Sequence, residues 1–209
     1  MKNSFRILAL AAAAAPAVFL TGCATGVQNP SGVPVTEMKA DERGFVAGTG
    51  VESQDLVAVT DKMARGVLGI PEIASAKVAP RIVLDPVVNE TRFPINKDIF
   101  LTRIRSQLNE KSMGKVRFLD REMMKTLERE RDLKRSGQVT ASSEPNVVEF
   151  RGADYFLTGK LQGLTTKNSQ GTSDYILYSF RLTDARTSEI VWESSSEIKK
   201  QGLEDAAYR

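Results

Sequence analysis

The sequence has no histidine and only one cysteine among its 209 residues. Without histidine it cannot build the imidazole base that most hydrolase triads use, nor the usual Cys/His zinc sites. A single cysteine also excludes a disulfide within the chain. We therefore expect no metal and no cofactor, and any catalysis would depend on Ser, Lys, Tyr and carboxylate side chains.

The charge balance is also nearly even, which argues against a nucleic-acid partner. The chain has 29 basic and 26 acidic residues, a formal charge of +3. Two of the basic residues, Lys2 and Arg6, lie in a segment that we expect to be removed, which leaves 29 − 2 = 27 basic against 26 acidic residues. A net charge of +1 gives no basic surface of the kind that binds nucleic acid.

The N-terminus has the pattern of a secretory signal. Residues 1–6 include two basic residues and no acid, and residues 7–20 form an apolar run that is too short for a membrane-spanning helix of roughly 20 residues. The tetrapeptide 20–23, Leu-Thr-Gly-Cys, directly follows and resembles the bacterial lipobox. We therefore expect a signal peptide over 1–22, cleavage between Gly22 and Cys23, and a lipid on Cys23.

Several acyl chains on Cys23 would anchor the protein durably, because each buried methylene contributes roughly 0.8 kcal/mol. Residue 24, which follows the lipidated cysteine, is Ala and not Asp. In what is known of lipoprotein sorting, this implies the outer membrane of a two-membrane bacterium. The protein is then expected to face the periplasm.

The segment 23–52 has the composition of a tether. It contains five glycines and two prolines, few large apolar residues and no clear period. Its 29 residues after the cysteine span at most about 95 Å at ~3.3 Å per residue. We expect a single globular domain to follow, over residues 53–209.

Hydrophobic periodicity predicts the elements of this domain. Ser53 is expected to cap a helix over 54–68, and a strand over 81–88 should end in a turn at 89–91. A strand over 116–119 lies between the two remaining helices, which are expected over 96–110 and 120–135. The second of these should have Met123, Met124 and Leu127 on its apolar side and Gly137 as C-cap.

Beyond a polar loop at 138–146 and one helical turn near 147–151, the period changes to two. Strands are predicted at 153–163 and 174–183, joined by a polar turn over 165–172. After a second turn at 184–188, a last strand should place Ile190, Trp192 and Ile198 on one face. The fold class expected is an α/β (α+β) sandwich, with one mixed sheet of about five strands and helices packed on it.

No catalytic constellation stands out. Ser-x-x-Lys, which can activate a serine, occurs at 112–115 and 196–199, but at a helix exit and in a strand, where a nucleophile at a helix start is required. The alternating acids and bases at 128–132 are typical of a solvated helix face. We therefore expect a protein that is not an enzyme.

Several segments in order resemble the penicillin-binding protein activator LpoB family of outer-membrane lipoproteins. They are Ile82-Val83-Leu84-Asp85 with Asn89-Glu90-Thr91, Gly114-Lys115-Val116-Arg117-Phe118-Leu119, Gly152-Ala153-Asp154-Tyr155-Phe156-Leu157 and Thr187-Ser188-Glu189-Ile190-Val191-Trp192. The resemblance implies a fold like the N-terminal domain of TolB. It also implies a non-catalytic role, in which the domain binds and activates a bifunctional penicillin-binding protein and so regulates peptidoglycan synthesis. The tether differs, because family members that reach an inner-membrane synthase carry a long, proline-rich one.

The candidate partner contacts are Asn89, Thr91 and Arg92 after the first strand, and Trp192 in the last one. Asn89 and Thr91 could equally serve only to form a turn, and Trp192 could pack in the core or on the sheet. A second family, the secretion lipoprotein CsgG, combines a lipobox with a similar domain. The alternative function is therefore secretion or envelope assembly as a homo-oligomer, without pore hairpins of its own.

Overall fold

A computed structural model describes residues 35–140 and 149–203 of the chain. Gly22 and Cys23 lie outside these residues, as does the start of the helical turn expected at 147–151; residues 149–151 are not helical. The chain divides into two units between Glu37 and Met38, and the second unit carries all the elements that follow.

Four helices and six strands are formed by the described residues. The helices are α1 (Ser53–Gly69), α2 (Pro71–Ala74), α3 (Asp98–Ser112) and α4 (Met124–Arg135), and the strands are β1 (Arg81–Leu84), β2 (Val88–Glu90), β3 (Arg117–Phe118), β4 (Tyr155–Asn168), β5 (Gly171–Asp184) and β6 (Ile190–Gly202). The strands form one mixed sheet with the order β3-β1-β4-β5-β6, and β2 pairs with β4 beside this path. β1, β2 and β3 join in parallel, whereas β4, β5 and β6 form an antiparallel meander. The predicted fold class is confirmed, with six strands instead of about five.

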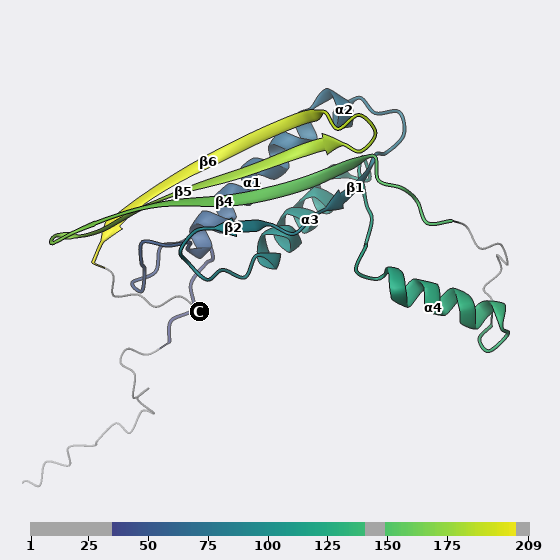
Figure 1. Cartoon of the computed structure of the whole chain (residues 1–209), viewed down its shortest axis with the longest axis horizontal. Helices are drawn as coiled ribbons and strands as arrows, with labels where there is room; N and C mark the ends of the chain where they lie inside the picture. The colour runs from purple at the N-terminus through teal and green to yellow at the C-terminus, as the bar shows by residue number, and fades with distance from the viewer. Residues whose placement is uncertain (1–34, 141–148, 204–209) are drawn as a thin grey trace, which may run out of the picture. The chain divides into compact units, whose positions relative to one another are not determined.

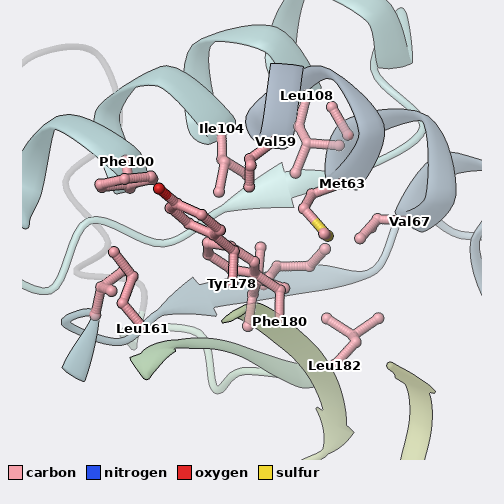
Figure 2. Packing of buried hydrophobic residues seen from close by; sticks show 14 of the residues in the cluster. Val59, Met63, Val67, Phe100, Ile104, Leu108, Leu161, Tyr178, Phe180 and Leu182 are labelled. Carbon is pink, nitrogen blue, oxygen red and sulfur yellow. The ribbon is translucent and has the colours of Figure 1, made fainter. Parts of the chain in front are cut away.

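The core lies between one face of the sheet and the helices α1 and α3 (Figure 1). Phe100, Ile104 and Leu108, predicted to face inward from α3, are completely buried. From the sheet, Tyr178 and neighbouring residues of β5 pack against them, and the rings of Phe100 and Tyr178 lie 6.2 Å apart (Figure 2). Along β5 every second residue is buried, so the strand turns one face to the helices and the other away from them.

The strand predicted over 81–88 is in fact two strands, because strand pairing is interrupted at Pro86. Asp85 donates the last backbone hydrogen bond to β4, at Leu157 O, and Pro86 has no N–H to continue the ladder. β1 itself lies between β3 and β4 in the sheet. Pairing resumes at Val88, so Asn89 and Glu90 lie in β2 and not in a turn.

The first hairpin of the meander is longer than predicted. The polar turn expected over 165–172 is wrong, because β4 and β5 remain paired as far as Asn168 and Gly171. In β6, a bulge shifts the register between Leu182 and Thr183 of the partner strand. Val191 is the extra residue, so it packs against the core while Ile190 is 49% exposed, contrary to the predicted alternation.

The helix boundaries differ from the prediction by a few residues. Glu52, not Ser53, is the N-cap of α1, in a capping box with Asp55. α3 begins two residues after Asn96, whose Oδ1 accepts a hydrogen bond from the N–H of Asp98 at 3.2 Å. Asp120 makes a turn before α4 instead of opening it, because its Oδ1 accepts from two backbone N–H groups ahead of the helix.

The expectation that α4 buries an apolar side is wrong. None of its residues is buried, and Leu127 is 42% exposed. The predicted cap is confirmed, because Gly137 has φ +72° and donates its N–H to Lys134 O while Gln138 donates to Leu133 O. Arg131 also places its guanidinium 3.6 Å from the centroid of the Phe150 ring. These local contacts, and not core packing, hold the helix.

Candidate functional site

The structure brings three of the predicted contact residues together and places the fourth elsewhere. Asn89, Thr91 and Arg92 lie at the end of β2 and in the loop that follows it. Trp192 lies on β6 opposite Leu182, where it packs against the core and against Gly66 of α1. These four residues therefore do not form one site.

Asn89 and Thr91 shape the loop after β2. Asn89 Oδ1 accepts hydrogen bonds from the backbone N–H of Thr91 at 3.0 Å and from its hydroxyl at 2.7 Å. Asn89 Nδ2 donates to the carbonyl oxygen of Phe93 at 2.8 Å. Because Asn89 uses both ends of its amide within the loop, it holds the backbone on either side of Arg92.

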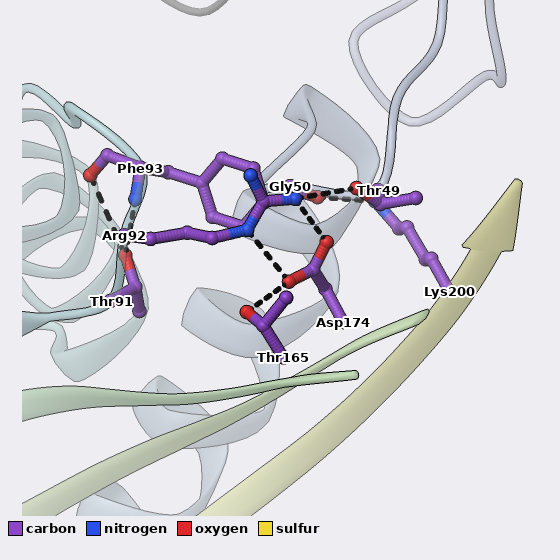
Figure 3. Close-up of polar contacts among 8 residues, drawn as sticks. All are labelled: Thr49, Gly50, Thr91, Arg92, Phe93, Thr165, Asp174 and Lys200. Atoms are coloured by element: carbon purple, nitrogen blue, oxygen red, sulfur yellow. Dashed lines mark hydrogen bonds and ion pairs between the residues drawn. The ribbon is translucent and has the colours of Figure 1, made fainter. Parts of the chain in front are cut away.

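Arg92 forms a bidentate ion pair with Asp174, near the start of β5. Its Nε donates to Asp174 Oδ1 at 2.9 Å and its Nη2 to Oδ2 at 2.6 Å (Figure 3). The Asp174 side chain is only 2% exposed. Thr165 of β4 donates its hydroxyl to Asp174 Oδ1 at 2.6 Å, and Arg92 Nη2 also donates to Thr49 Oγ1 at 3.3 Å. One buried carboxylate thus joins the loop after β2, the β4–β5 hairpin and the N-terminal segment.

The contacts explain the electrostatics of this cluster. The hydrogen bonds from Arg92 lower the pKa of Asp174 from 3.8 to about 2, although burial opposes the shift. A carboxylate with so low a pKa stays ionised at neutral pH and takes no part in proton transfer. The guanidinium of Arg92 also lies 4.3 Å from the centroid of the Phe93 ring. Arg92, which we predicted as a partner contact, therefore makes contacts that stabilise the fold.

A second ion pair holds the same N-terminal segment. Lys200, near the end of β6, pairs with Asp55 of α1 and donates to the carbonyl oxygen of Gly50 at 2.9 Å. The two side chains are 18% and 6% exposed. Thr49, next to Gly50, is itself buried. The fold therefore includes residues that we expected in the tether, and the chain is held from Thr49 onward.

Sequence reasoning missed the acid and the lysine on which this cluster depends. Asp174 shares its face of β5 with Ile176, Tyr178 and the other inward residues, and Lys200 shares its face of β6 with Ile198. A charge at an inward position of an alternating strand must be paired or hydrogen-bonded, which was the available signal. The partner could not be read from it, because Arg92 is 82 residues from Asp174.

Neither a metal-binding cluster nor a membrane-spanning helix is found among the described residues. Within 35–140 and 149–203, no group of three or more His, Cys, Asp and Glu side chains is placed to hold a metal ion. No helix in this part of the chain has the length and apolar character needed to cross a membrane. The contacts around Asp174 thus have a structural role, because they fix where the chain enters the domain.

Comparisons with known proteins identify the domain. The model of the family described as peptidoglycan-synthase activator LpoB matches residues 55–198. Two similar solved structures are the LpoB C-terminal domains from Salmonella enterica (14% identity, TM-score 0.43) and from Escherichia coli (17%, 0.41), each covering 69% of this chain and 98% of that chain. Lipoprotein GNA1162 from Neisseria meningitidis is 16% identical, with a TM-score of 0.37, and covers 58% of this chain and 83% of its own.

No curated protein matches the chain. The family match does not favour the CsgG-type alternative. It spans more than half of the chain, from α1 to near the end of β6, and it agrees with the resemblance that the sequence motifs carry. The chain therefore belongs to the LpoB family of peptidoglycan-synthase activators.

Proposed function

We propose that this chain is an outer-membrane lipoprotein that binds and activates a bifunctional penicillin-binding protein from the periplasmic side. The observation that carries the proposal is the family match over residues 55–198, which comprise nearly the whole sheet and its helices. In this proposal residues 1–22 are a signal peptide and Cys23 is the lipidated N-terminus. The tether, predicted over 23–52, ends at residue 48 in this proposal, and the domain that follows contacts the synthase.

The protein is proposed to act by binding and not by catalysis. The two Ser-x-x-Lys pairs support this reading. Ser112 is 2% exposed and its hydroxyl donates to Asn109 O at 3.4 Å, whereas Lys115 is exposed. Ser196 and Lys199 are three positions apart in β6, so their side chains leave opposite faces of the strand. Neither lysine is placed to activate its serine.

The position at which the tether joins the domain limits the distance between the domain and the outer membrane. Because Thr49 and Gly50 are held by Arg92 and Lys200, only the 48 − 23 = 25 residues from 24 to 48 are left to extend. Fully extended, they span at most about 80 Å at ~3.3 Å per residue. The proposed partner must therefore place its binding surface within the combined reach of this tether and the domain from the outer membrane.

In-cell cross-linking tests this function. Intact cells would carry the full-length protein with a C-terminal tag, and the linked partners would be identified by mass spectrometry. The matched control is Cys23→Ala, which removes the proposed lipid site and leaves the domain unchanged. Recovery of a bifunctional penicillin-binding protein that is lost in the control would support the proposal. Recovery of only self-assemblies or secretion components would contradict it.

A further inference from the structure

We propose that the synthase docks on one end of the sheet and places a basic side chain in a hollow beside Glu72, Tyr155 and Asp184. This end, called the distal end here, is where β1, β3 and β4 begin and β5 finishes. The inference rests on the proposed function and deepens it, because it assigns the surface and the chemistry of the partner group.

The distal end carries a hollow of about 440 Å³. Six of its twelve lining residues are apolar and come from the segment before β1, the segment before β4 and the turn after β5: Ala76, Val78, Ala79, Pro80, Ala153 and Ala185. Val78 is 72% exposed, although it is a large apolar residue. The hollow is therefore wide enough for a side chain and offers it apolar walls.

Carboxylates outnumber bases around this hollow. Of its three acids, Asp154 is already engaged, because its Oδ2 accepts from the Arg81 N–H at 2.7 Å and lies 3.7 Å from the Arg81 guanidinium. Asp184 Oδ1 accepts from the backbone N–H groups of Arg186 at 2.7 Å and Thr187 at 3.1 Å. The three carboxylates still exceed the two bases, Arg81 and Arg186, by one charge. The hollow thus favours a cation from outside, such as an arginine or lysine of the partner.

The titration of Tyr155 agrees with this charge pattern. Burial raises the pKa of the Tyr155 hydroxyl, and Asp184, Glu72 and Asp154 raise it further, while Arg186 lowers it. A negative field that disfavours a phenolate favours a bound cation for the same reason.

A strained methionine lies at the same end of the sheet. Met113 follows α3 in the left-handed conformation, with φ +49°, and is 92% exposed. It precedes β3, which starts beside β1 with Arg117 opposite Arg81. This conformation is unfavourable for a residue other than glycine, and a large apolar side chain gains nothing from facing water. An adaptable methionine is instead suited to a protein contact.

The distal end also lies opposite the point where the tether joins the domain. The pairs that hold Thr49 and Gly50 are at Asp174 and Lys200, whereas Asp184 ends β5 at the hollow. The ten residues from Asp174 to Asp184 correspond to about 33 Å at ~3.3 Å per residue. Figure 1 shows α2 at one end of the long strands and the β4–β5 turn at the other. A domain drawn away from its membrane would present the distal end to the synthase.

A photo-cross-linking amino acid placed at single positions of the full-length protein tests the surface. The distal probe is Val78, and the matched control is Val46, which has the same exposure of 72% and precedes the held segment. A third probe, at Leu177 of β5, reports on the sheet face turned away from the helices. We expect the synthase to link to position 78 and not to 46 or 177. Linkage at 46 or 177 without 78 would overturn the inference but leave the proposed function intact.

A charge reversal tests the basic group. With each purified bifunctional penicillin-binding protein of the source bacterium, Glu72→Lys should weaken binding by at least tenfold, whereas the exposed control Glu37→Lys should leave it unchanged. If the unmodified protein binds and Glu72→Lys binds equally well, the hollow does not receive a cation. If the unmodified protein binds no synthase, the proposed function fails and the inference fails with it.

Discussion

Arg92 and Asp174 meet through two parallel hydrogen bonds, of 2.9 Å and 2.6 Å, although 82 residues separate them in the chain. The carboxylate is buried, and the arginine reaches it from the loop that Asn89 and Thr91 hold in place. Together with Thr49, this pair sets where the tether leaves the domain. The stability of the domain and the direction of its tether therefore depend on the same contact.

Replacing Arg92 should destabilise the fold substantially. In Arg92→Met the carboxylate of Asp174 remains buried without its cation, and we expect the free energy of unfolding to fall by about 2–3 kcal/mol. Urea unfolding measures the loss. The control Arg92→Met with Asp174→Leu removes both charges and should recover part of it; a double variant less stable than Arg92→Met would contradict this account of the pair.

The same pair predicts sensitivity to acid. The pKa of Asp174 is about 2 in the folded protein, below its ordinary value of 3.8, so protonation favours the unfolded chain. Its contribution, about 2 kcal/mol, is fully present above pH 4 and is lost as the pH falls from about 4 to 2. In Asp174→Asn this part of the pH dependence should disappear. If the free energy of unfolding falls equally steeply with pH in both proteins across that range, Asp174 is not the titrating group.

The sequence predicted the inward faces well and the polar structure poorly. Phe100, Ile104 and Leu108 were identified because burial repeats with the helical period, and all three are buried. Residues 165–168 were assigned to a turn because they are polar, yet they lie in β4. A strand that runs beyond the core is held by backbone pairing, which leaves no hydrophobic period to detect.

The site was predictable only in part, for a related reason. The motif after the first predicted strand drew attention to Asn89, Thr91 and Arg92 but not to the acid that Arg92 pairs with, since a pairing across 82 residues leaves no local pattern. The bulge that exposes Ile190 was equally hidden, because one extra residue in β6 reverses the alternation without changing the composition.

The contact between α1 and Trp192 predicts that Gly66 cannot be replaced by alanine without a loss of stability. A Cβ on Gly66 would lie 2.8 Å from Trp192 Cζ2, whereas a Cβ on Gly69 would meet nothing within 4 Å. Gly66→Ala should therefore destabilise the domain by about 1–3 kcal/mol despite the better helix propensity of alanine. Gly69→Ala should be neutral or stabilising. Thermal unfolding followed by the fluorescence of Trp192, the only tryptophan, compares the two; equal midpoints would contradict the close packing.

Two leucines test how differently α3 and α4 are held. Leu108 of α3 is fully buried, whereas Leu127 of α4 is 42% exposed. Leu108→Ala should cost about 2–5 kcal/mol of unfolding free energy, and Leu127→Ala less than about 0.5 kcal/mol. Denaturant unfolding of both variants measures the difference. A large loss for Leu127→Ala would show that α4 packs on the domain after all.

The proposed function requires this protein to raise the activity of a peptidoglycan synthase. The direct measurement is the rate of glycan-strand polymerisation by a purified bifunctional penicillin-binding protein, with and without the purified full-length protein. We predict a rate that rises with added protein and saturates, with a weaker effect for Glu72→Lys. A rate that stays unchanged at saturating concentrations, for every bifunctional synthase of the bacterium, would contradict the claim.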